Sequence, residues 1–237
     1  MPNVSRRLEV AGYDDYLREW RALHGLEPDR MRHGFLDTYL RLPYAIARPL
    51  ARRGASPDLL TLYGLVVTGG CLPAYLAGGR WPTLGVFAIL LGGLCDQLDG
   101  CVGILTRRTS AFGAVWDSTI DRLTDALLLL GPALLVSEPV AYWGLAAAGT
   151  SGFLLEYVRA RCQAVGYVTA QVVTPAERPT RVVVGALMAL GCGVVPADAD
   201  VVVSFLAWGL TGLSATSVVL LLVDARRRAR GSGAVGG

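Results

Sequence analysis

Four of the aspartates inside two neighbouring apolar stretches of this chain, residues 82–105 and 111–136, form two closely spaced pairs. They are Asp96, Asp99, Asp117 and Asp121. A carboxylate at the centre of a membrane-spanning helix costs about 2.5–3.5 kcal/mol, so four would cancel roughly what about twenty apolar residues contribute to insertion. Because the spacings within the pairs are i,i+3 and i,i+4, each pair lies on one face of its helix. Two such faces form a cage of oxygen ligands for a hard divalent cation, Mg²⁺ or Mn²⁺, which would compensate the charges.

The apolar content is high for a soluble domain, since 53% of the 237 residues are hydrophobic. A helix rises about 1.5 Å per residue, so a run of about twenty apolar residues crosses the hydrocarbon core of a bilayer. Six runs approach or reach that length: Leu59–Gly79, Pro82–Leu105, Ala111–Val136, Val140–Val158, Thr180–Val195 and Val201–Val223. The sequence therefore predicts an all-α, polytopic membrane protein with six transmembrane helices.

The connections between these runs differ in charge. All 22 basic residues are arginines, and they gather before the first run, in the second and fourth connections, and after the last run. The first connection holds only Arg80, and the third and fifth hold acids and no base. Since cytoplasmic connections carry the excess of basic residues, both termini and the active site are predicted to face the cytoplasm. We expect the membrane to be the plasma membrane.

The N-terminal part of the chain is expected to lie outside the bilayer core. Residues 1–35 form a polar cytoplasmic extension without the pattern of a cleavable signal peptide, and residues 13–23 within it are predicted to form a short surface helix. Residues 36–56 mix apolar side chains with arginines, which is typical of an amphipathic helix at the membrane interface. Pro43 and Pro49 favour breaks in that helix.

The rest of the chain divides into a membrane domain, residues 57–224, and a basic cytoplasmic tail, residues 225–237. The tail arginines fit a topology anchor that contacts lipid headgroups better than a nucleic-acid surface. We therefore expect membrane lipid, and no nucleic acid, among the partners.

A spaced motif surrounds the four aspartates. The chain reads Asp96-Gln-Leu-Asp99-Gly100-Cys-Val-Gly103-Ile104, then eight residues, then Gly113-Ala-Val-Trp-Asp117-Ser-Thr-Ile-Asp121. This resembles the signature of the CDP-alcohol phosphotransferases, Asp-x-x-Asp-Gly-x-x-Ala-Arg, eight residues, Gly-x-x-x-Asp-x-x-x-Asp. Every aspartate and glycine of that signature is in place, whereas Gly103 replaces its alanine and Ile104 its arginine.

The resemblance extends from about residue 50 to residue 184. The opening of the first run, Ser56-Pro57-Asp58-Leu-Leu-Thr61-Leu-Tyr-Gly64, is similar to the Pro-Asn/Asp-x-x-Thr-x-x-Gly of this family. Two later stretches look most like the actinobacterial phosphatidylinositol phosphate synthase branch: Glu156-Tyr-Val-Arg159-Ala-Arg161-Cys-Gln-Ala-Val-Gly166 and Glu177-Arg178-Pro-Thr-Arg181. The resemblance implies a homodimer that transfers a phosphatidyl group from CDP-diacylglycerol to inositol phosphate and releases CMP.

The same resemblance implies roles for the motif residues. The divalent metal would be held by four carboxylates: Asp96, Asp99, Asp117 and Asp121. Asp121 would also be the catalytic base that takes the proton of the attacking hydroxyl. The CDP portion of the donor would contact a wider set: Asp58, Thr61, Asp96, Asp99, Gly100, Arg107 and Gly113.

The phosphate of the acceptor would be bound by arginines of the fourth connection, which the resemblance places at basic positions of the branch. They are Arg159, Arg161, Arg178 and Arg181. Forked guanidinium groups suit phosphate oxygens, although the positive-inside rule alone would also put arginines there. Glu156 either pairs with one of these arginines or contacts an acceptor hydroxyl.

Ile104 is the main departure from the family, in which the arginine at that position contacts the CDP diphosphate. Arg107 or Arg108, one turn later, could replace it, the donor could differ, or the chain could have lost its activity. Glycerol 3-phosphate or a specialised alcohol could be the acceptor instead of inositol phosphate. A cation-conducting protein would need carboxylates spread through the depth of the bilayer, whereas these four gather toward one side.

Overall fold

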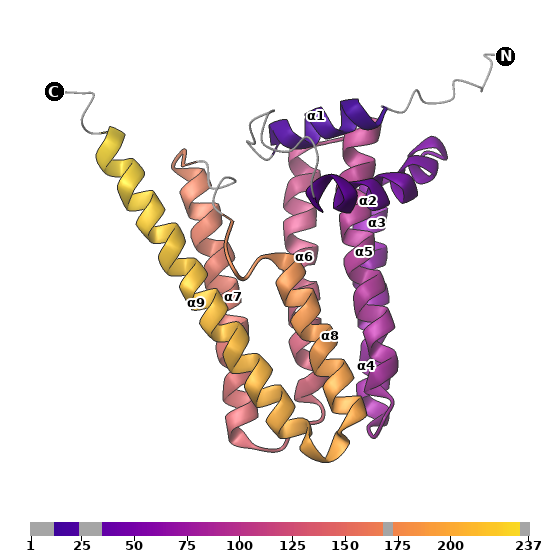
Figure 1. Cartoon of the computed structure of the whole chain (residues 1–237), viewed down its shortest axis with the longest axis vertical. Coiled ribbons are helices and arrows are strands. Elements are labelled where there is room, and N and C mark those ends of the chain that lie inside the picture. The colour runs from indigo at the N-terminus through magenta and orange to yellow at the C-terminus, as the bar shows by residue number, and fades with distance from the viewer. Residues whose placement is uncertain (1–11, 24–34, 168–172, 233–237) are drawn as a thin grey trace. The chain divides into compact units, whose positions relative to one another are not determined.

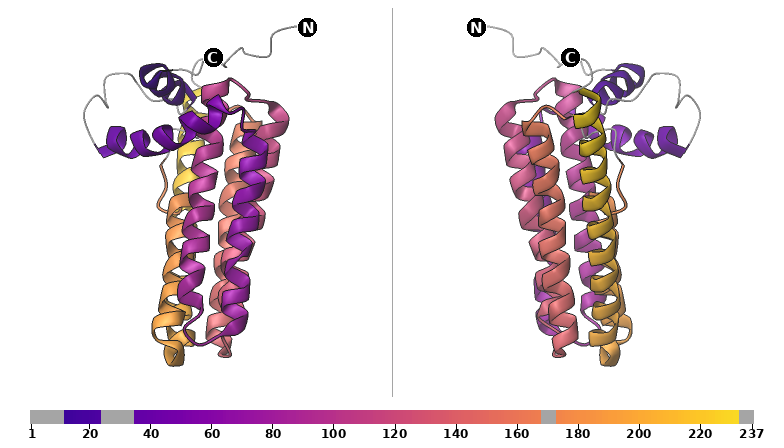
Figure 2. Two further views of the ribbon diagram at one scale, coloured as in Figure 1. Left: turned by 90° about the vertical axis from the view of Figure 1, so that its right-hand side faces the viewer. Right: turned by 90° about the vertical axis from the view of Figure 1, so that its left-hand side faces the viewer.

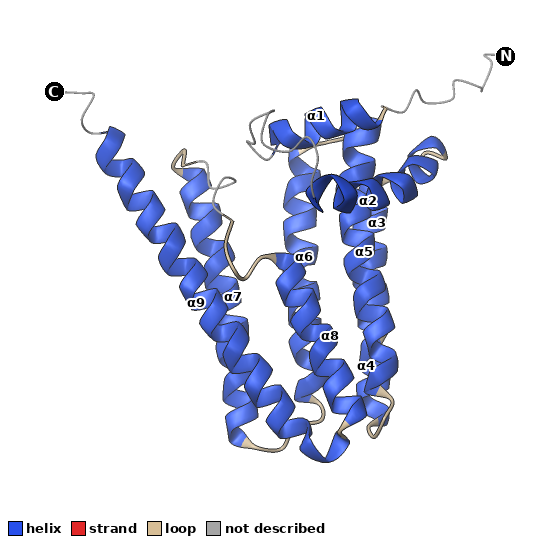
Figure 3. Ribbon diagram, in the orientation of Figure 1, coloured by secondary structure: helices blue, strands red, loops and turns tan. Residues whose placement is uncertain are grey.

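The computed structural model describes residues 12–23, 35–167 and 173–232, in which every regular element is a helix (Figures 1 and 3). The helices are α1 (Tyr13–Leu23), α2 (Phe35–Arg52), α3 (Pro57–Gly69), α4 (Cys71–Ala77), α5 (Pro82–Thr106), α6 (Ala111–Ala133), α7 (Pro139–Ala164), α8 (Arg178–Val194), the 3₁₀ turn η2 (Pro196–Asp198) and α9 (Ala199–Ser232). Parts of the predicted N-terminal extension, 1–11 and 24–34, and of the tail, 233–237, lie outside the described residues. The all-α class is confirmed for the part of the chain that is described.

The chain divides into two compact units. Unit 1 comprises residues 1–68 and 91–123, and unit 2 comprises residues 69–90 and 124–237. Helices α5 and α6 each contribute one part to unit 1 and another part to unit 2. The segment boundaries expected near residues 35, 56 and 224 stay a prediction.

In unit 1, the apolar face of α1 packs against other helices of the same unit. Tyr13, Tyr16, Leu17 and Trp20 have the i, i+3, i+4, i+7 spacing of one helix face, and the residues between them are exposed. Tyr16 is fully buried in a cluster with apolar residues of α2 and of the C-terminal part of α5. A helix is therefore present over residues 13–23, as predicted, and its apolar face contributes to the core of unit 1.

Helix α2 runs without interruption through Pro43 and Pro49. Its buried residues Leu40, Ala47 and Ala51 lie on one face and join the same cluster as Tyr16. A proline inside a helix costs about 3 kcal/mol or more, and burial of this apolar face provides a stabilising contribution that opposes the cost. The expected breaks do not occur for this reason, while the position of α2 at a membrane interface stays a prediction.

Unit 2 contains α4, α7, α8, α9 and the remaining parts of α5 and α6. Its largest apolar cluster draws residues from all of these helices. Figure 2 shows α8 reversing into α9 through a short connection, which is η2. Glycine permits the closest contacts: a Cβ atom on Gly131 would lie 2.5 Å from the Tyr75 ring, and one on Gly193 would lie 2.5 Å from the backbone nitrogen of Thr83.

Among the described residues, three helical stretches are long and apolar enough to cross a membrane: Pro57–Ala77, Pro82–Thr106 and Pro196–Ala229. Helices α6 and α7 have 23 and 26 residues, but charged side chains interrupt their apolar sequence. Helix α8 has 17 residues, which is at the lower limit for a span. Three of the six predicted spans thus satisfy both length and composition, and the other three stay predictions.

Candidate metal centre and active site

Helix α5 separates its acidic residues from its core residues. Asp96 and Asp99 are three residues apart and share a face. The residues that join the core of unit 1 follow another stripe of the helix: Leu98, Cys101, Val102 and Leu105. Because α1 and α2 pack on this apolar stripe, α5 is held from one side while its carboxylates point to another.

Three of the four aspartates converge. Carboxylate oxygens of Asp96, Asp99 and Asp117 all lie within 4.8 Å of one another. Asp99 is only 6% exposed, and its Oδ2 atom has no hydrogen-bond partner within the described part of the chain. A buried carboxylate oxygen without a partner is costly, and a cation ligated by it would remove that cost. Three converging carboxylates are the donor set that Mg²⁺ and Mn²⁺ prefer, so these residues fit a divalent metal.

Asp121 follows Asp117 by one turn of α6 and is half-buried. In the described residues it is not a member of the group of three whose oxygens lie within 4.8 Å. Its two predicted roles, as fourth metal ligand and as base, therefore stay predictions.

The residues predicted to bind CDP lie at the starts of α3 and α6 and on α5. The indole Nε1 of Trp116 donates a hydrogen bond to the backbone oxygen of Asp58 at 3.2 Å, which joins the first turn of α3 to the second turn of α6. Thr61 of α3 is buried, and its side chain interacts with the carboxylate of Asp99. These contacts bring Asp58 and Thr61 into the same part of unit 1 as the three carboxylates.

The two predicted CDP-binding glycines have different surroundings. A Cβ atom on Gly113 would lie 3.1 Å from Ser110 Oγ and 3.4 Å from Asp58 Oδ1, so the start of α6 is closely packed there. Gly113 also donates its backbone N–H to Ser110 Oγ at 2.9 Å. Gly100 is exposed and a Cβ atom on it would meet no atom within 4 Å. Packing therefore does not explain a glycine at position 100, whereas close approach of a ligand would.

The departure at Ile104 has a structural counterpart. Ile104 is 6% exposed and belongs to the same apolar cluster as Tyr16 and the buried face of α2. Arg107 lies in the turn after α5, is exposed, and has a positive φ of 53°. A methyl group on Gly103 would meet Thr109 Cγ2 and Pro57 Cγ at ordinary contact distances of 3.8 and 3.9 Å, so the family alanine would fit at that position.

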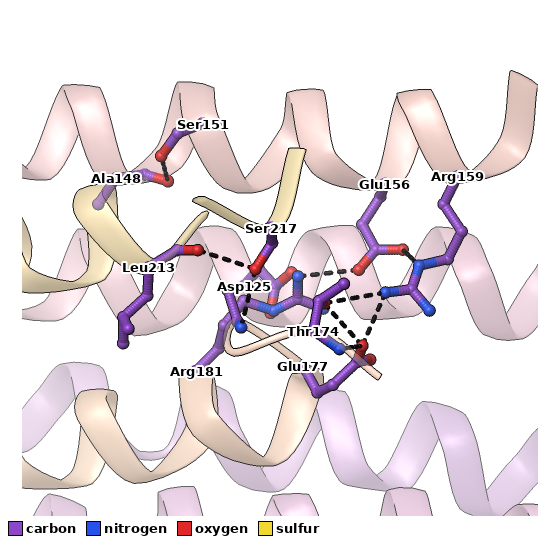
Figure 4. Close-up of polar contacts among 11 residues, drawn as sticks. Asp125, Ala148, Ser151, Glu156, Arg159, Thr174, Glu177, Arg181, Leu213 and Ser217 are labelled. Atoms are coloured by element: carbon purple, nitrogen blue, oxygen red, sulfur yellow. Dashed lines mark hydrogen bonds and ion pairs between the residues drawn. The ribbon is translucent and has the colours of Figure 1, made fainter. Parts of the chain in front are cut away.

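In unit 2, two of the four candidate phosphate-binding arginines lie in a network of carboxylates (Figure 4). Arg181 is buried, with its Nη1 atom 2.9 Å from Glu156 Oε1 and its Nε atom 3.4 Å from Asp125 Oδ1. Arg159 Nε lies 3.8 Å from Glu156 Oε2. The expected pairing of Glu156 with an arginine is confirmed, and the network connects α6, α7 and α8.

The same network fixes the loop before α8. Arg159 Nη2 lies 2.8 Å from Glu177 Oε1, and Thr174 donates both its N–H and its hydroxyl to that oxygen at 3.0 and 2.7 Å. Burial acts to raise the pKa of Glu177, but the hydrogen bonds from Arg159 and Thr174 outweigh it and hold this pKa below its usual value. Glu177 is therefore a charged anchor that orients Arg159.

The other two arginines differ in exposure. Arg161 is exposed near the end of α7, whereas Arg178 is half-buried in the first turn of α8. Sequence reasoning did not identify Asp125 and Thr174 as parts of this network. Asp125 could have been singled out from the sequence, since it is a further carboxylate in the apolar run 111–136. Nothing in the sequence marks Thr174.

Known proteins resemble this chain in sequence and in fold. A family model described as CDP-alcohol phosphatidyltransferase matches residues 55–221. The archaetidylinositol phosphate synthase of Methanothermobacter thermautotrophicus is 34% identical over 140 residues, which cover 57% of this chain and 67% of that protein. The phosphatidylinositol phosphate synthase of Streptomyces avermitilis is 34% identical over 133 residues, 54% of each chain.

Solved structures agree with these relatives. The crystal structure of Mycobacterium tuberculosis phosphatidylinositol phosphate synthase with CDP-DAG bound has a TM-score of 0.62 and 25% identity, and the match covers 78% of this chain and 94% of that chain. The same enzyme in complex with manganese and citrate has a TM-score of 0.65 at 24% identity, covering 77% and 88%. Since the family model matches well over half of the residues, this chain belongs to the CDP-alcohol phosphatidyltransferase family.

Proposed function

We propose that this chain transfers the phosphatidyl group of a CDP-linked lipid, CDP-diacylglycerol, to inositol phosphate and releases CMP. The convergence of Asp96, Asp99 and Asp117, with a buried oxygen of Asp99 that lacks a hydrogen-bond partner, is the observation that carries the proposal. Support for the substrates comes from relatives: one is named an archaetidylinositol phosphate synthase, another a phosphatidylinositol phosphate synthase, and one solved neighbour has CDP-DAG bound.

The chemistry follows from charge and position. A bound Mg²⁺ or Mn²⁺ would neutralise the donor diphosphate and the charge that develops on departing CMP. Asp96, Asp99 and Asp117, with Asp121 as a fourth ligand, would hold that ion. The manganese complex of the mycobacterial enzyme supports a divalent cation of this kind.

Asp121 is proposed as the base. Its carboxylate would accept the proton of the acceptor hydroxyl as the hydroxyl oxygen bonds to the lipid-side phosphorus of the donor. The bond from that phosphorus to the bridging oxygen breaks, and the electron pair leaves with CMP. Asp58, Thr61, Gly100 and Gly113 would position the nucleotide, with Arg107 as a further contact.

The acceptor phosphate is assigned to the arginines of unit 2. Arg161, which is exposed, and Arg178, in the first turn of α8, would bind it directly. Arg159 and Arg181 would add charge from fixed positions, because Glu177 and Glu156 hold their guanidinium groups. The carboxylates lower the net charge of this network. We therefore expect it to contribute to phosphate binding by the fixed orientation of its guanidinium groups as well as by electrostatic attraction.

The location and assembly are also proposals. We propose an integral protein of the plasma membrane that has its termini and active site on the cytoplasmic side and functions as a homodimer. Long apolar helices with many exposed apolar side chains support contact with membrane lipid. The expected exclusion of nucleic acid as a partner rests on the loop charges alone.

The proposal is tested by CMP release from the purified protein in detergent. The assay contains CDP-diacylglycerol, Mg²⁺ or Mn²⁺, and either inositol 1-phosphate or glycerol 3-phosphate as acceptor. We expect metal-dependent CMP release with inositol 1-phosphate, loss of it in Asp121→Asn, and retention in the matched control Asp198→Asn, which changes an exposed aspartate of η2. Release with glycerol 3-phosphate alone would reassign the acceptor, and absence of release with both would overturn the proposed activity.

A further inference from the structure

Tyr16 connects the N-terminal helix to the helix that carries two of the converging aspartates. Its side chain is fully buried, and its hydroxyl lies 3.0 Å from Cys101 Sγ on α5, 85 residues later in the chain. Cys101 follows Asp99 by two residues. A contact between segments so distant in sequence fixes the tertiary position of α5 at this turn.

The position of α1 is itself fixed from a second side. The rings of Tyr13 and Tyr44 meet edge-on at a centroid distance of 5.1 Å, and the rings of Tyr16 and Tyr44 lie 5.4 Å apart. The guanidinium carbon of Arg41 lies 5.0 Å from the centre of the Tyr13 ring. Aromatic pairs and cation–π contacts of this kind favour a specific arrangement of the helices that carry them.

Tyr16 contacts a face of α5 other than the one that bears the carboxylates. Cys101 lies on the stripe of α5 that packs in the core of unit 1, whereas Asp96 and Asp99 lie on another face. Rotation of α5 about its axis would therefore require Tyr16 to leave its buried position. A metal site needs its ligands held within a fraction of an ångström, and residues behind the ligands supply that precision.

We propose that Tyr16 is a positioning residue of the metal centre: packed on Cys101, it holds α5 in the rotation that directs Asp96 and Asp99 toward Asp117. The inference rests on the proposed metal site and extends it to a residue outside the family motif. Ile104 belongs to the same cluster, so the residue that replaces the family arginine serves the packing that positions the carboxylates.

The test is Mn²⁺ binding to the full chain in detergent, measured by electron paramagnetic resonance. Tyr16→Ala is expected to weaken Mn²⁺ binding about tenfold, within the range seen when residues behind metal ligands are removed. Tyr16→Phe keeps the ring and is expected to stay within about threefold of the original affinity, because ring packing remains. Tyr75→Ala is the matched control, since Tyr75 is equally buried but belongs to unit 2.

Thermal unfolding of each variant separates positioning from general loss of stability. The inference requires that Tyr75→Ala lowers the melting temperature at least as much as Tyr16→Ala and leaves Mn²⁺ affinity unchanged. Equal affinity in Tyr16→Ala and the original chain, or an equal loss in Tyr75→Ala, would overturn it. If Tyr16→Ala does not fold, Tyr16→Leu, which removes the ring but keeps a smaller apolar side chain, takes its place, and Mn²⁺ binding is again expected to be weaker than in Tyr16→Phe.

The outcomes also distinguish this inference from the proposed function. If the chain without substitutions binds no Mn²⁺, both the proposed metal site and the inference are overturned. An original chain that binds Mn²⁺ in a Tyr16-dependent way but releases no CMP would uphold the inference and overturn the activity.

Discussion

At the scale of single residues, Asp99 shows how a candidate metal site can lower the stability of the folded chain. Its carboxylate is buried beside those of Asp96 and Asp117, and one of its oxygens has no hydrogen-bond partner in the described part of the chain. Like charges and desolvation both oppose such a cluster until a cation binds. The free energy of unfolding should therefore depend on metal, and the effect of removing one of these charges on stability should have opposite signs without and with metal.

We predict that the difference in melting temperature between Asp99→Asn and the original chain changes sign when a chelator removes the metal. With EDTA, the variant should melt a few degrees higher than the original chain, because one buried charge is gone. With saturating Mg²⁺, it should melt lower, because ligand binding stabilises the native state by about 2.7 kcal/mol at a hundred times the dissociation constant and the variant loses much of that. Melting followed by intrinsic fluorescence measures both; a variant that is less stable in both conditions would contradict the prediction.

Ile104 illustrates a departure from a family motif that the tertiary structure explains. A guanidinium placed at this buried position would be surrounded by the apolar cluster of unit 1. We predict that Ile104→Arg, which restores the family residue, lowers the free energy of unfolding by several kcal/mol and does not raise the rate of CMP release. Ile104→Leu is the control and should cost less than about 1.5 kcal/mol. Higher activity in Ile104→Arg would show that the cluster opens to release this side chain toward the donor.

At the scale of elements, Asp200 in the first turn of α9 is bonded to the start of α7. Its Oδ1 accepts the backbone N–H groups of Ser137 and Glu138 at 2.9 and 2.8 Å, and its Oδ2 accepts the Ser137 hydroxyl at 3.0 Å. These N–H groups precede the first turn of α7, where a helix has no internal acceptor to offer. One carboxylate thus fixes the N-terminal ends of α7 and α9 relative to each other within unit 2.

We predict that Asp200→Ala destabilises the chain by about 1–2 kcal/mol, as loss of a helix-capping side chain does. The measurement is the melting temperature in detergent. Asp198→Ala, two residues earlier and exposed, is the control and should change it little. Equal effects of the two substitutions would mean that the contacts of Asp200 with α7 contribute nothing.

The loop before α8 depends on a charged group with a depressed pKa. Hydrogen bonds from Arg159 and Thr174 lower the pKa of Glu177 despite its partial burial. A carboxylate with a lowered folded-state pKa contributes stability that is present above its unfolded value, about 4.3, and is lost as the pH falls through its folded value. The contribution of Glu177 should therefore be full at neutral pH and vanish in acid.

We predict that Glu177→Gln lowers the melting temperature at pH 7 and that the difference from the original chain shrinks below about pH 4.3. The measurement is a melting series across pH in one detergent. Glu138→Gln, which changes an exposed glutamate outside the network, should show no such pH-dependent difference. A difference for Glu177→Gln that is constant with pH would indicate lost packing and not lost charge.

At the scale of the whole molecule, the cysteines allow a test of topology. All five lie in the described residues, are free and are buried, so they should react slowly with a membrane-impermeant maleimide. We predict that Ala197→Cys, in the connection before α9, is labelled in intact cells, whereas Arg53→Cys, before α3, is labelled only after lysis. The reason is the positive-inside rule, which places the arginine-rich connections in the cytoplasm. The reverse labelling would invert the orientation and put the aspartates on the outer side.

Much of the molecule could be predicted from local pattern. The length of the apolar runs identified α5 and α9, because a run of about twenty apolar residues can be recognised without knowledge of its neighbours. The spacing within two pairs, Asp96 with Asp99 and Asp117 with Asp121, predicted a metal site because one helix turn places each pair on one face. The structure brings together the oxygens of the first three. The continuity of α2 through Pro43 and Pro49 was not predicted, because it depends on burial against other helices.

The sequence by itself determined the helical class and the chemistry of the carboxylates, since both depend on residues that are neighbours along the chain. Only the tertiary structure decided which arginines are held by acids, why position 104 is apolar, and that Tyr16 packs on Cys101. Each of these is a contact between segments far apart in sequence. Such contacts are selected by the packing of whole helices, and no local periodicity encodes them.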